Sequence, residues 1–382
     1  MGRTGKASGV RRRLARSVCG FLTGLLVCGT VWGQAAPARG TQLAKDKQER
    51  IEQAAAKFMA TSKAPGISVA VVENGEFVWS EGFGMADLEQ FVPATPQTLF
   101  RLASLSKQMT AVAAMQLSEE GKLDLDAPVQ KYCPAFPQKE APITTRLLLA
   151  HLAGVRHYKS ETQDDPESGN TKHFDDPIKG GLQMFANDPL VAKPGTKFNY
   201  TTHGYTVVGC AIEGASGEKY VDYVREHVFA PAGMSHSRAD DRFEIIPFRT
   251  RFYHKDEGGS VWNADFLDSS YKIPGGGWLS SADDMARFEV AVLNDKLMKR
   301  TTRDAMWTPQ KTSDGKTNGY ALGWGWREKE GLKFIGHSGG QQGTSTYILL
   351  DPEKRDGVVV LINMDDVDAQ ALAVEVLKVV IK

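Results

Sequence analysis

The hexapeptide Leu102-Ala103-Ser104-Leu105-Ser106-Lys107 stands at the start of a predicted helix and contains a Ser-x-x-Lys tetrad. Residues three apart lie on the same face of a helix, so the Lys107 side chain can reach the hydroxyl of Ser104. A serine hydroxyl is a weak nucleophile at neutral pH and needs a neighbour to take its proton. A lysine can do this when burial and nearby cations disfavour its charged form. The tetrad therefore indicates Ser104 as a nucleophile and Lys107 as its partner.

The residues around this tetrad favour a buried position. On its own the motif is a weak signal, because most such tetrads are an exposed serine and a solvated lysine on an ordinary helix. Here the flanking residues are apolar, and Gly121 is a natural C-terminal stop for the helix. The predicted helix has one apolar stripe, formed by Leu105, Met109, Val112, Ala113 and Leu117.

Composition excludes one large class of function. The chain has 382 residues, enough for one large domain or two modest ones, and its 46 Lys and Arg balance its 46 Asp and Glu. It has no basic stripe with interleaved aromatic residues. We therefore expect no nucleic-acid partner.

The first 35 residues have the pattern of a secretory signal peptide. An arginine-rich segment precedes the uncharged apolar run from Val18 to Trp32, and small residues follow it. We expect residues 1–35 to be a leader, residues 36–46 to be a linker, and the protein to be exported to a periplasm or the outside. An uncleaved leader or a lipidated Cys28 are the alternatives, and either would associate the protein with a membrane.

Two cysteines, Cys133 and Cys210, remain if the leader is removed. Two thiols this far apart do not make a disulfide framework. Cys210 lies in an apolar helical run, typical of a buried small hydrophobe. We expect no disulfide between them.

Helices and strands alternate in blocks along the remaining chain. A helix is predicted over 47–62, followed by strands over 67–73 and 76–84 that are joined by Asn74-Gly75, the strongest short hairpin signal. Helices and loops dominate from 121 to about 270. Strands return near 278–281, 320–326, 332–337, 344–350 and 358–363, with helices over 281–293 and 367–381.

This order predicts one α/β (α+β) domain over 47–382. Its antiparallel sheet is flanked by helices and built from both ends of the chain, about 47–105 and 274–382, with a helical subdomain inserted over about 106–273. A cleft between the two parts is the expected place for catalytic groups. The polar stretch 159–180 is interpreted as a solvated surface insertion.

Two further motifs accompany the tetrad. Tyr200-Thr201-Thr202 lies at a loop-to-helix junction, and His337-Ser338-Gly339-Gly340 lies at the end of a strand. With Ser104 and Lys107, they resemble the serine β-lactamase and penicillin-binding-protein group, whose motifs are Ser-x-x-Lys, Tyr-x-Asn and Lys-Thr-Gly or His-x-Gly. The resemblance is to its class C β-lactamase and D-alanyl-D-alanine carboxypeptidase side, and covers roughly residues 50–365.

Four shorter stretches point to one branch of that group. They are similar to the mitochondrial serine β-lactamase-like protein of animals and its bacterial relatives, a branch associated with peptide or amide hydrolysis. The stretches are 156–158, 187–190, 249–253 and 268–272.

The resemblance implies a β-lactamase/transpeptidase-like fold and a role for each motif residue. Ser104 would form the acyl-enzyme, and Lys107 and Tyr200 would transfer protons, with the main base left open between them. The backbone N–H groups of Ser104 and Gly340 would form the oxyanion hole. The expected substrate-binding residues are Thr202, His337, Ser338 and Gly339.

Two departures from the group's motifs bear on substrate choice. Thr202 replaces an asparagine, and a hydroxyl offers less to a substrate amide than a carboxamide does. His337 replaces the lysine of the β-lactamases and removes a fixed cation for a drug carboxylate. Both departures argue against efficient penicillin turnover.

We therefore predict a serine hydrolase that cleaves a small peptide, amide or ester, without a metal or other cofactor. The histidines at 151, 157 and 203 lack metal-ligand spacing with acidic or cysteine partners, and Tyr205, Trp278, Trp324 and Trp326 are expected in the core. The alternatives are a true β-lactamase, an esterase, or a binding or assembly protein that kept the fold and lost turnover.

Overall fold

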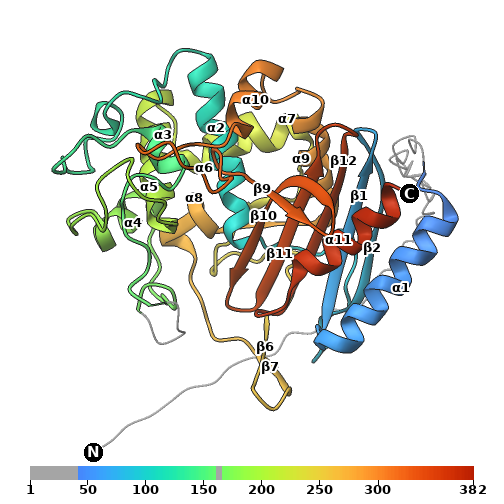
Figure 1. The fold of residues 1–382 in the computed structure, drawn as a ribbon. Coiled ribbons are helices and arrows are strands. Elements are labelled where there is room, and N and C mark those ends of the chain that lie inside the picture. The colour runs from blue at the N-terminus through green and yellow to red at the C-terminus, as the bar shows by residue number, and fades with distance from the viewer. Residues whose placement is uncertain (1–41, 161–165) are drawn as a thin grey trace, which may run out of the picture. The chain divides into compact units, whose positions relative to one another are not determined.

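A seven-stranded antiparallel sheet forms the centre of the protein, which is described here by a computed structural model (Figure 1). The structure describes residues 42–160 and 166–382, so the predicted leader 1–35 lies outside the described residues. The strand order is β3-β2-β1-β12-β11-β10-β9. The strands are β1 (Gly66–Glu73), β2 (Glu76–Asp87), β3 (Val92–Pro93), β9 (Gly325–Lys329), β10 (Leu332–Gln341), β11 (Thr344–Asp351) and β12 (Asp356–Ile362).

The pairing of β1 with β12 joins the two ends of the chain. The predicted Asn74-Gly75 turn forms between β1 and β2, and both residues have the positive φ that such a turn needs, 56° and 79°. On its other side β1 pairs with β12, with Val69 opposite Val360. The sheet built from both ends of the chain is thereby confirmed.

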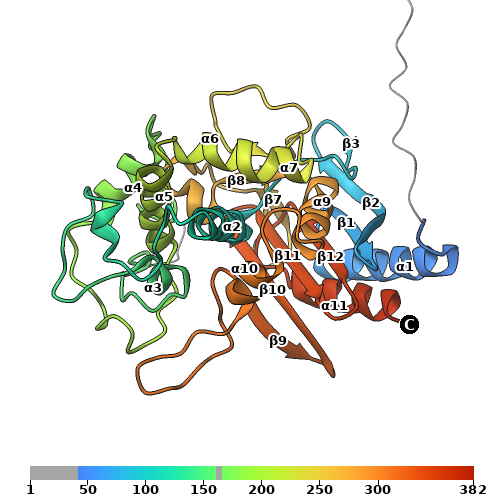
Figure 2. The same cartoon turned by 90° about the horizontal axis from the view of Figure 1, so that it is seen from above.

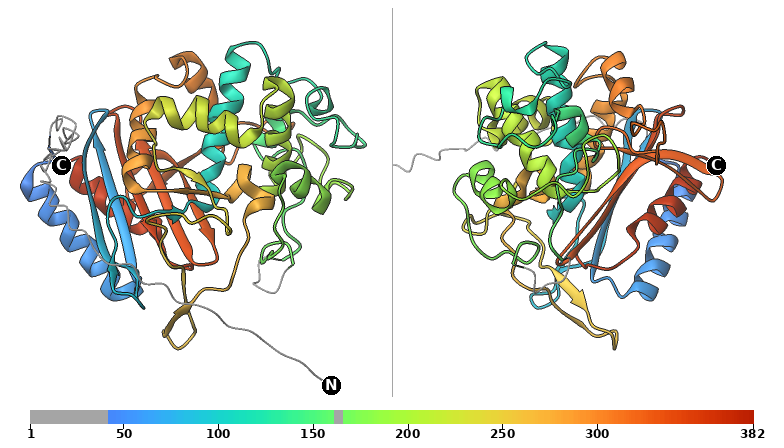
Figure 3. Two further views of the ribbon diagram at one scale, coloured as in Figure 1. Left: turned by 180° about the vertical axis from the view of Figure 1, so that it is seen from behind. Right: turned by 60° about the vertical axis from the view of Figure 1, so that its left-hand side comes forward.

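Alternating side chains of β1 supply two separate cores. Val69 and Val71 pack on one face with α11 (Ala369–Val380), which lies beside α1 (Lys45–Ser62) (Figures 1 and 3). Ala70 and Val72 face the other side, which is covered by α9 (Ala282–Leu293) and the helical part of the chain (Figure 2). The period of two along a strand thus divides one apolar run between two layers.

The helical part lies on the α9 side of the sheet, and its central helices bear the sequence motifs. Thr144, Thr201 and Ser281 cap the N-termini of α3, α5 and α9 by accepting a backbone N–H bond. The helices are α2 (Ser106–Glu119), α3 (Thr145–Leu149), α4 (Pro177–Phe185), α5 (Thr202–Ser216), α6 (Tyr220–Val224), α7 (Ala230–Ala232), α8 (Ile273–Gly276) and α10 (Arg300–Trp307).

Two smaller sheets of short strands lie outside the seven-stranded sheet. β4 (Phe100–Arg101) and β5 (Arg238–Ala239) flank β8 (Trp278–Ser280), and β6 (Tyr253–Lys255) pairs with β7 (Val261–Asn263). The predicted boundaries between an α/β part and a helical part stay a prediction.

Three local predictions need correction. The strand expected over 320–326 begins only at Gly325, because the preceding residues form a tight loop in which Ala321 N–H donates to the Trp324 carbonyl. The helices α4 and α10 were not predicted. The stretch 159–180 is not a wholly solvated insertion: Glu167 and Asn170 are buried, since ion pairs and backbone hydrogen bonds tie them to the helical part.

A disulfide joins Cys133 to Cys210, so the expectation of no disulfide was wrong. Cys210 lies on α5, and Cys133 follows a short 3-10 turn over Val129–Lys131. The two Cα atoms are 5.3 Å apart, within the range that a disulfide spans. Close packing of α5 on this turn brings the thiols together: a side chain at Gly214 would collide with the carbonyl of Tyr132.

No helix within the described ranges is both long enough and apolar enough to cross a bilayer.

We predict that replacing both cysteines by alanine lowers the free energy of unfolding by about 2–5 kcal/mol, because the disulfide closes a loop between residues 77 apart. Urea unfolding of the variant and of the wild type, each with and without reductant, measures this. Reductant should destabilise the wild type alone. An equal response of both proteins would contradict a disulfide in solution.

Candidate active site

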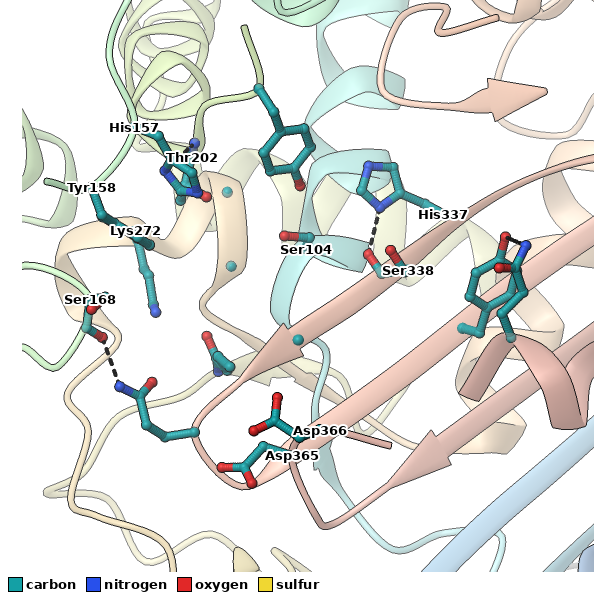
Figure 4. Close-up of a pocket in the computed structure, with 18 of the residues that line it drawn as sticks. Ser104, His157, Tyr158, Ser168, Thr202, Lys272, His337, Ser338, Asp365 and Asp366 are labelled. Carbon is teal, nitrogen blue, oxygen red and sulfur yellow. Dashed lines mark hydrogen bonds between the residues drawn. The ribbon is translucent and has the colours of Figure 1, made fainter. Parts of the chain in front are cut away.

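Ser104 faces a cavity of about 600 Å³ that lies between the helical part and the outer strands of the sheet (Figure 4). The cavity gathers residues from distant parts of the sequence. It brings together Ser104, Tyr200, Thr202, His337, Ser338 and Gly340 of the predicted site. Other lining residues were not predicted, among them His157, Tyr158, Ser168, Lys272, Gly276, Tyr320, Arg327, Gln341, Gln342, Asp365 and Asp366.

The backbone just before Ser104 adopts an unusual conformation. Ala103 is buried and has φ 48°, a left-handed value that costs a non-glycine residue about 1–3 kcal/mol. The surroundings hold it there: Leu102 N–H donates to the Trp278 carbonyl at 2.8 Å, and Thr346 Oγ1 donates to the Leu102 carbonyl at 3.0 Å. Ser104 is therefore presented to the cavity from a rigid turn.

Gly339 explains how strand β10 approaches this turn. A Cβ at Gly339 would lie 2.3 Å from the Leu102 carbonyl oxygen and 2.2 Å from Thr346 Oγ1. Only a glycine lets the strand pass so close to the backbone beside Ser104. A Cβ at Gly340 would meet nothing within 4 Å, so Gly340 faces open space in the cavity. The geometry leaves room for a substrate at the predicted oxyanion hole.

The amine of Lys107 is fully buried and contacts the hydroxyl of Ser104. Its Nζ lies 3.0 Å from Ser104 Oγ, 2.7 Å from the Gly275 carbonyl oxygen and 3.3 Å from Thr202 Oγ1. Burial, reinforced by the charge of Lys272, lowers the pKa of Lys107 well below its usual value. An uncharged amine is therefore accessible at neutral pH.

The three partners of Lys107 can serve either form of the amine. An ammonium has three donors, and the Gly275 carbonyl, Thr202 Oγ1 and Ser104 Oγ can each accept one of them. A neutral amine has two N–H donors and one lone pair. In that form the amine can donate to Gly275 and Thr202 and keep its lone pair for the proton of Ser104, which is the arrangement a general base requires.

Tyr200 lies on the same side of the cavity as Lys107. Lys107 Nζ is 4.9 Å from the centroid of its ring, and the rings of His151 and His337 lie 4.2 and 6.1 Å away. Tyr200 immediately precedes the Thr201 cap of α5. The two predicted proton-transfer groups, Lys107 and Tyr200, thus stand beside one cavity.

His337 marks the point where strand β10 loses its outer neighbour. Strand β9 pairs with β10 only as far as Gly336 opposite Gly325. Beyond it, residues 337–341 pair with β11 on one side and face the cavity on the other. This open strand edge can accept an extended chain through backbone hydrogen bonds.

Both ring nitrogens of His337 are occupied by hydrogen bonds. Nε2 lies 2.9 Å from the Tyr320 hydroxyl, and Nδ1 lies 2.6 Å from the Ser338 carbonyl oxygen (Figure 4 shows the second bond). Burial, reinforced by the charge of Lys107, lowers the pKa of His337 to about 3. His337 is therefore neutral and supplies no cation to stabilise a Tyr200 phenolate. Its direct contact with substrate stays a prediction, as do those of Thr202, Ser338 and Gly339.

A second buried lysine, Lys272, lines this cavity, and the sequence analysis did not single it out as a site residue. Its side chain is 3% exposed and points into the cavity (Figure 4). Burial, with a smaller effect of Arg101, lowers the pKa of Lys272 to about 7. Lys272 immediately precedes α8, whose Gly275 carbonyl accepts the bond from Lys107. The resemblance covered this stretch, but a lone lysine in it has no spacing that would signal a site.

Gln341 is a second residue that was missed. It is on strand β10 beside Gly340 and lines the cavity. Its side-chain nitrogen is buried and has no hydrogen-bond partner within the described part of the chain.

Arg156 and Glu167 hold the cavity wall that contains His157, Tyr158 and Ser168. The guanidinium of Arg156 binds both carboxylate oxygens of Glu167, at 2.7 and 2.8 Å, and His203 Nε2 lies 3.1 Å from the same carboxylate. Burial opposes the charge of Glu167, but the bonds from His203 and Arg156 outweigh it and hold its pKa at about 2. This wall is pinned by a charged network rather than by apolar packing.

Two groups of potential metal ligands exist among the described residues, and neither contains a predicted catalytic residue. One group is Glu218, Glu226 and His227, and the other is His254, Asp365 and Asp366. Asp365 already binds His254 Nδ1 and the Gly343 N–H. The absence of a metal or other cofactor stays a prediction.

The chain matches the family model described as Beta-lactamase over residues 51–380. It is 34% identical to the human protein "Serine beta-lactamase-like protein LACTB, mitochondrial", with 77% of this chain and 70% of the relative covered.

Two solved structures share its fold at high coverage. The octameric penicillin-binding protein homologue from Pyrococcus abyssi superposes with a TM-score of 0.76 at 28% identity, covering 87% of this chain and 77% of that one. A D-stereospecific amidohydrolase from Streptomyces gives a TM-score of 0.71 at 25% identity, with 86% and 97% covered. The predicted β-lactamase/transpeptidase-like fold is confirmed.

We predict that Lys272→Met changes the pH dependence of Ser104 reactivity. The fall in rate on the acid side of the pH–rate profile (the acid limb) should move to higher pH. Without the Lys272 charge the protonated form of Lys107 is less disfavoured, so the pKa of Lys107 rises and less of its free amine is present at low pH. The rate of inactivation by a fluorophosphonate, measured across pH, reads this directly.

Two further variants make this test specific. Lys272→Arg keeps a cation and should leave the limb near its wild-type position. Lys139→Met removes a partly buried lysine whose amine binds the carbonyls of Ala186 and Asp188 outside the cavity, and it should not move the limb. An equal shift in both methionine variants would refute the role of Lys272.

Proposed function

The chain belongs to the β-lactamase family, and from the geometry of its cavity we propose that it is a serine hydrolase that cleaves a small peptide, amide or ester through an acyl-enzyme on Ser104. One observation carries this proposal. The fully buried amine of Lys107 lies 3.0 Å from Ser104 Oγ, and burial lowers its pKa well below the usual value. In its neutral form the amine can donate to Gly275 and Thr202 and keep its lone pair for the serine proton. A lysine kept only for stability has no need of a buried place against a cavity-facing hydroxyl.

Acylation would begin with attack of Ser104 Oγ on the substrate carbonyl carbon. The proton of Ser104 passes to Lys107, and the carbonyl oxygen becomes an oxyanion bound by the N–H groups of Ser104 and Gly340. The C–N or C–O bond then breaks. The leaving amine or alcohol takes a proton from Lys107 or Tyr200, and the acyl group remains on Ser104.

Deacylation would return the enzyme to its starting state. A water molecule attacks the acyl carbon while Tyr200 or Lys107 accepts its proton, and the C–O bond to Ser104 breaks. Ser104 regains a proton and the carboxylic acid product leaves. Two proton-transfer groups beside one serine suit this exchange, because the acid of one step must act as the base of the next.

The shape of the cavity supports a chain-like substrate. The edge of β10 at residues 337–341 lies open beside Ser104, and an extended acyl or peptide segment can pair with it. The neutral His337 offers no cation at the place where β-lactamases of this group carry lysine. We therefore place peptide, amide and ester substrates ahead of penicillins.

We propose that the protein acts after export, in an oxidising compartment. The disulfide between Cys133 and Cys210 supports this, because disulfides persist in such compartments and are rare in reducing ones. N-terminal sequencing of the protein recovered from outside the cytoplasm tests it. A start near residue 36 would support a cleaved leader, whereas an intact N-terminus or a lipidated Cys28 would contradict one.

We predict that a fluorophosphonate adds one adduct to the wild-type protein and none to Ser104→Ala, as measured by intact mass. Turnover by Ser104→Ala should fall by a factor on the order of 10³ or more, because the nucleophile is lost, with an unchanged thermal unfolding midpoint. Absence of an adduct on folded wild type would instead favour a binding or assembly protein that has lost turnover.

We predict that Tyr200→Phe slows both acylation and deacylation, by roughly 10²–10⁴-fold for a proton-transfer group. Single-turnover kinetics with a slow ester separate the two steps. Tyr132→Phe is the control, because its hydroxyl accepts the Asp124 N–H bond outside the cavity. Wild-type rates in Tyr200→Phe would remove Tyr200 from the mechanism.

A further inference from the structure

Three buried side chains connect the Tyr200 segment to strand β10 through hydrogen bonds. His151 Nδ1 accepts the Thr201 N–H at 3.1 Å, and His151 Nε2 lies 3.2 Å from the Tyr320 hydroxyl. The same hydroxyl lies 2.9 Å from His337 Nε2, and His337 Nδ1 lies 2.6 Å from the Ser338 carbonyl. The three side chains are 0%, 3% and 8% exposed.

The two ends of this connection determine the direction of every bond in it. The Thr201 N–H can only donate, so Nδ1 of His151 has no proton and its Nε2 carries one. The Ser338 carbonyl can only accept, so Nδ1 of His337 carries the proton and its Nε2 accepts. Tyr320 has one proton, and because His337 Nε2 can only accept, the bond to His337 uses that proton while Tyr320 accepts from His151. The adjacent Tyr205 hydroxyl gives its own proton to the Leu149 carbonyl. These tautomers are assigned from the network, and one assignment satisfies all four bonds.

We propose that His151, Tyr320 and His337 form a one-directional hydrogen-bond chain that holds Tyr200 and the Ser338–Gly340 strand edge in position around Ser104. The proposal rests on the function proposed above. The three are positioning residues, since each acts through a neighbour. Because both ends are backbone groups that cannot titrate, the chain orients groups and carries no proton through the site.

His151 is tied to both residues that flank Tyr200. Its carbonyl accepts the Asn199 N–H at 2.8 Å, and its ring accepts the Thr201 N–H. The Tyr200 ring packs against the His151 imidazole, with centroids 4.2 Å apart. His151 itself has φ 59°, so its backbone is held in a left-handed conformation. A shift of His151 would therefore move the Tyr200 ring.

The other end of the chain reaches the predicted oxyanion hole. The Ser338 carbonyl lies two residues before Gly340, on the stretch of β10 beyond the end of its pairing with β9. An unpaired strand edge lacks the bonds that hold a central strand. The bond from His337 supplies one such constraint, and Tyr320 fixes the ring that makes it.

Burial keeps His337 in its neutral form. It is the main cause that disfavours a proton on the ring, and Lys107 from α2 (when protonated) and Arg327 from β9 add to it, while the bond to the Ser338 carbonyl opposes it. The centroid of the Tyr200 ring lies 6.1 Å from that of His337. Burial also lowers the pKa of His151 well below its usual value. A protonated His337 could not accept the hydrogen bond from Tyr320. The direction of the chain therefore requires a neutral His337 ring.

Tyr320→Phe is the decisive variant because it removes one hydroxyl and keeps the ring. We expect inactivation by a fluorophosphonate to slow about tenfold or more, in line with the sensitivity of such sites to small misplacements. His337 Nε2 loses its donor, which favours its protonated form, so the pKa of His337 should rise above its wild-type value, as ¹⁵N-histidine NMR measures. Tyr320→Phe combined with His337→Asn should slow inactivation no more than His337→Asn alone, because both changes break the same chain.

Tyr220→Phe is the matched control. Tyr220 is 1% exposed, and its hydroxyl lies 3.2 Å from Trp278 Nε1 and 2.7 Å from Thr110 Oγ1. It is thus also the middle of a buried hydrogen-bond chain, but it does not line the cavity. We expect its inactivation rate to stay within about threefold of wild type. An equal slowing in both variants, or an unchanged pKa of His337 in Tyr320→Phe, would reduce the chain to a structural role and overturn the proposal.

Histidine NMR tests the chain without using activity. In wild-type protein labelled with ¹⁵N-histidine, we expect neutral His151 with its proton on Nε2 and neutral His337 with its proton on Nδ1 at pH 6. The opposite tautomer or a charged ring at either position would overturn the chain. If the wild-type protein does not react with the fluorophosphonate, the proposed function fails. The NMR measurement still shows whether the hydrogen-bond chain exists.

Discussion

Burial of the Lys107 amine is the constraint on which the rest of the site depends. An ammonium without a carboxylate partner is costly in an apolar interior. Here the amine meets a carbonyl and two hydroxyls, and burial lowers its pKa well below the usual value. Three separate segments must converge to provide those partners: the turn at Ser104, the N-terminus of α5 and the α8 segment. Much of the fold serves to hold these segments against one another.

The same constraint explains the electrostatics of the surrounding cavity. His151, His157 and His337 all have lowered pKa values, mainly because of burial, and Lys107 adds to this effect when it is protonated. Lys272 is a second buried lysine in this cavity, and when protonated it in turn lowers the pKa of Lys107. The β-lactamases of the group carry a lysine on the strand. In this protein the strand carries a neutral histidine, and the buried lysine of the cavity wall lies in the segment before α8.

Rigid support around the site comes from two sources that differ in kind. Apolar packing on both faces of β1 and β12 fixes the sheet, and the disulfide ties α5 to the turn beside it. Closer to the cavity, polar networks hold the structure in place. The Arg156–Glu167 pair holds one wall, and the His151–Tyr320–His337 chain joins the Tyr200 segment to strand β10. Directional bonds can specify the orientation of a ring, which packing alone does less well.

The sequence by itself determined the fold class and the residues of the three motifs. Hydrophobic periodicity and the Asn74-Gly75 turn are local signals, so the hairpin, α1, α2 and the closing strands could be predicted from them. The positions of Lys272, Tyr320 and Gln341 could not, because lone polar residues in loops and on a strand have no spacing to reveal them. Only the tertiary structure decided that they share a cavity with Ser104, that Cys133 meets Cys210, and that Glu167 is buried. Each depends on contacts between segments far apart in the chain, and no local pattern encodes such contacts.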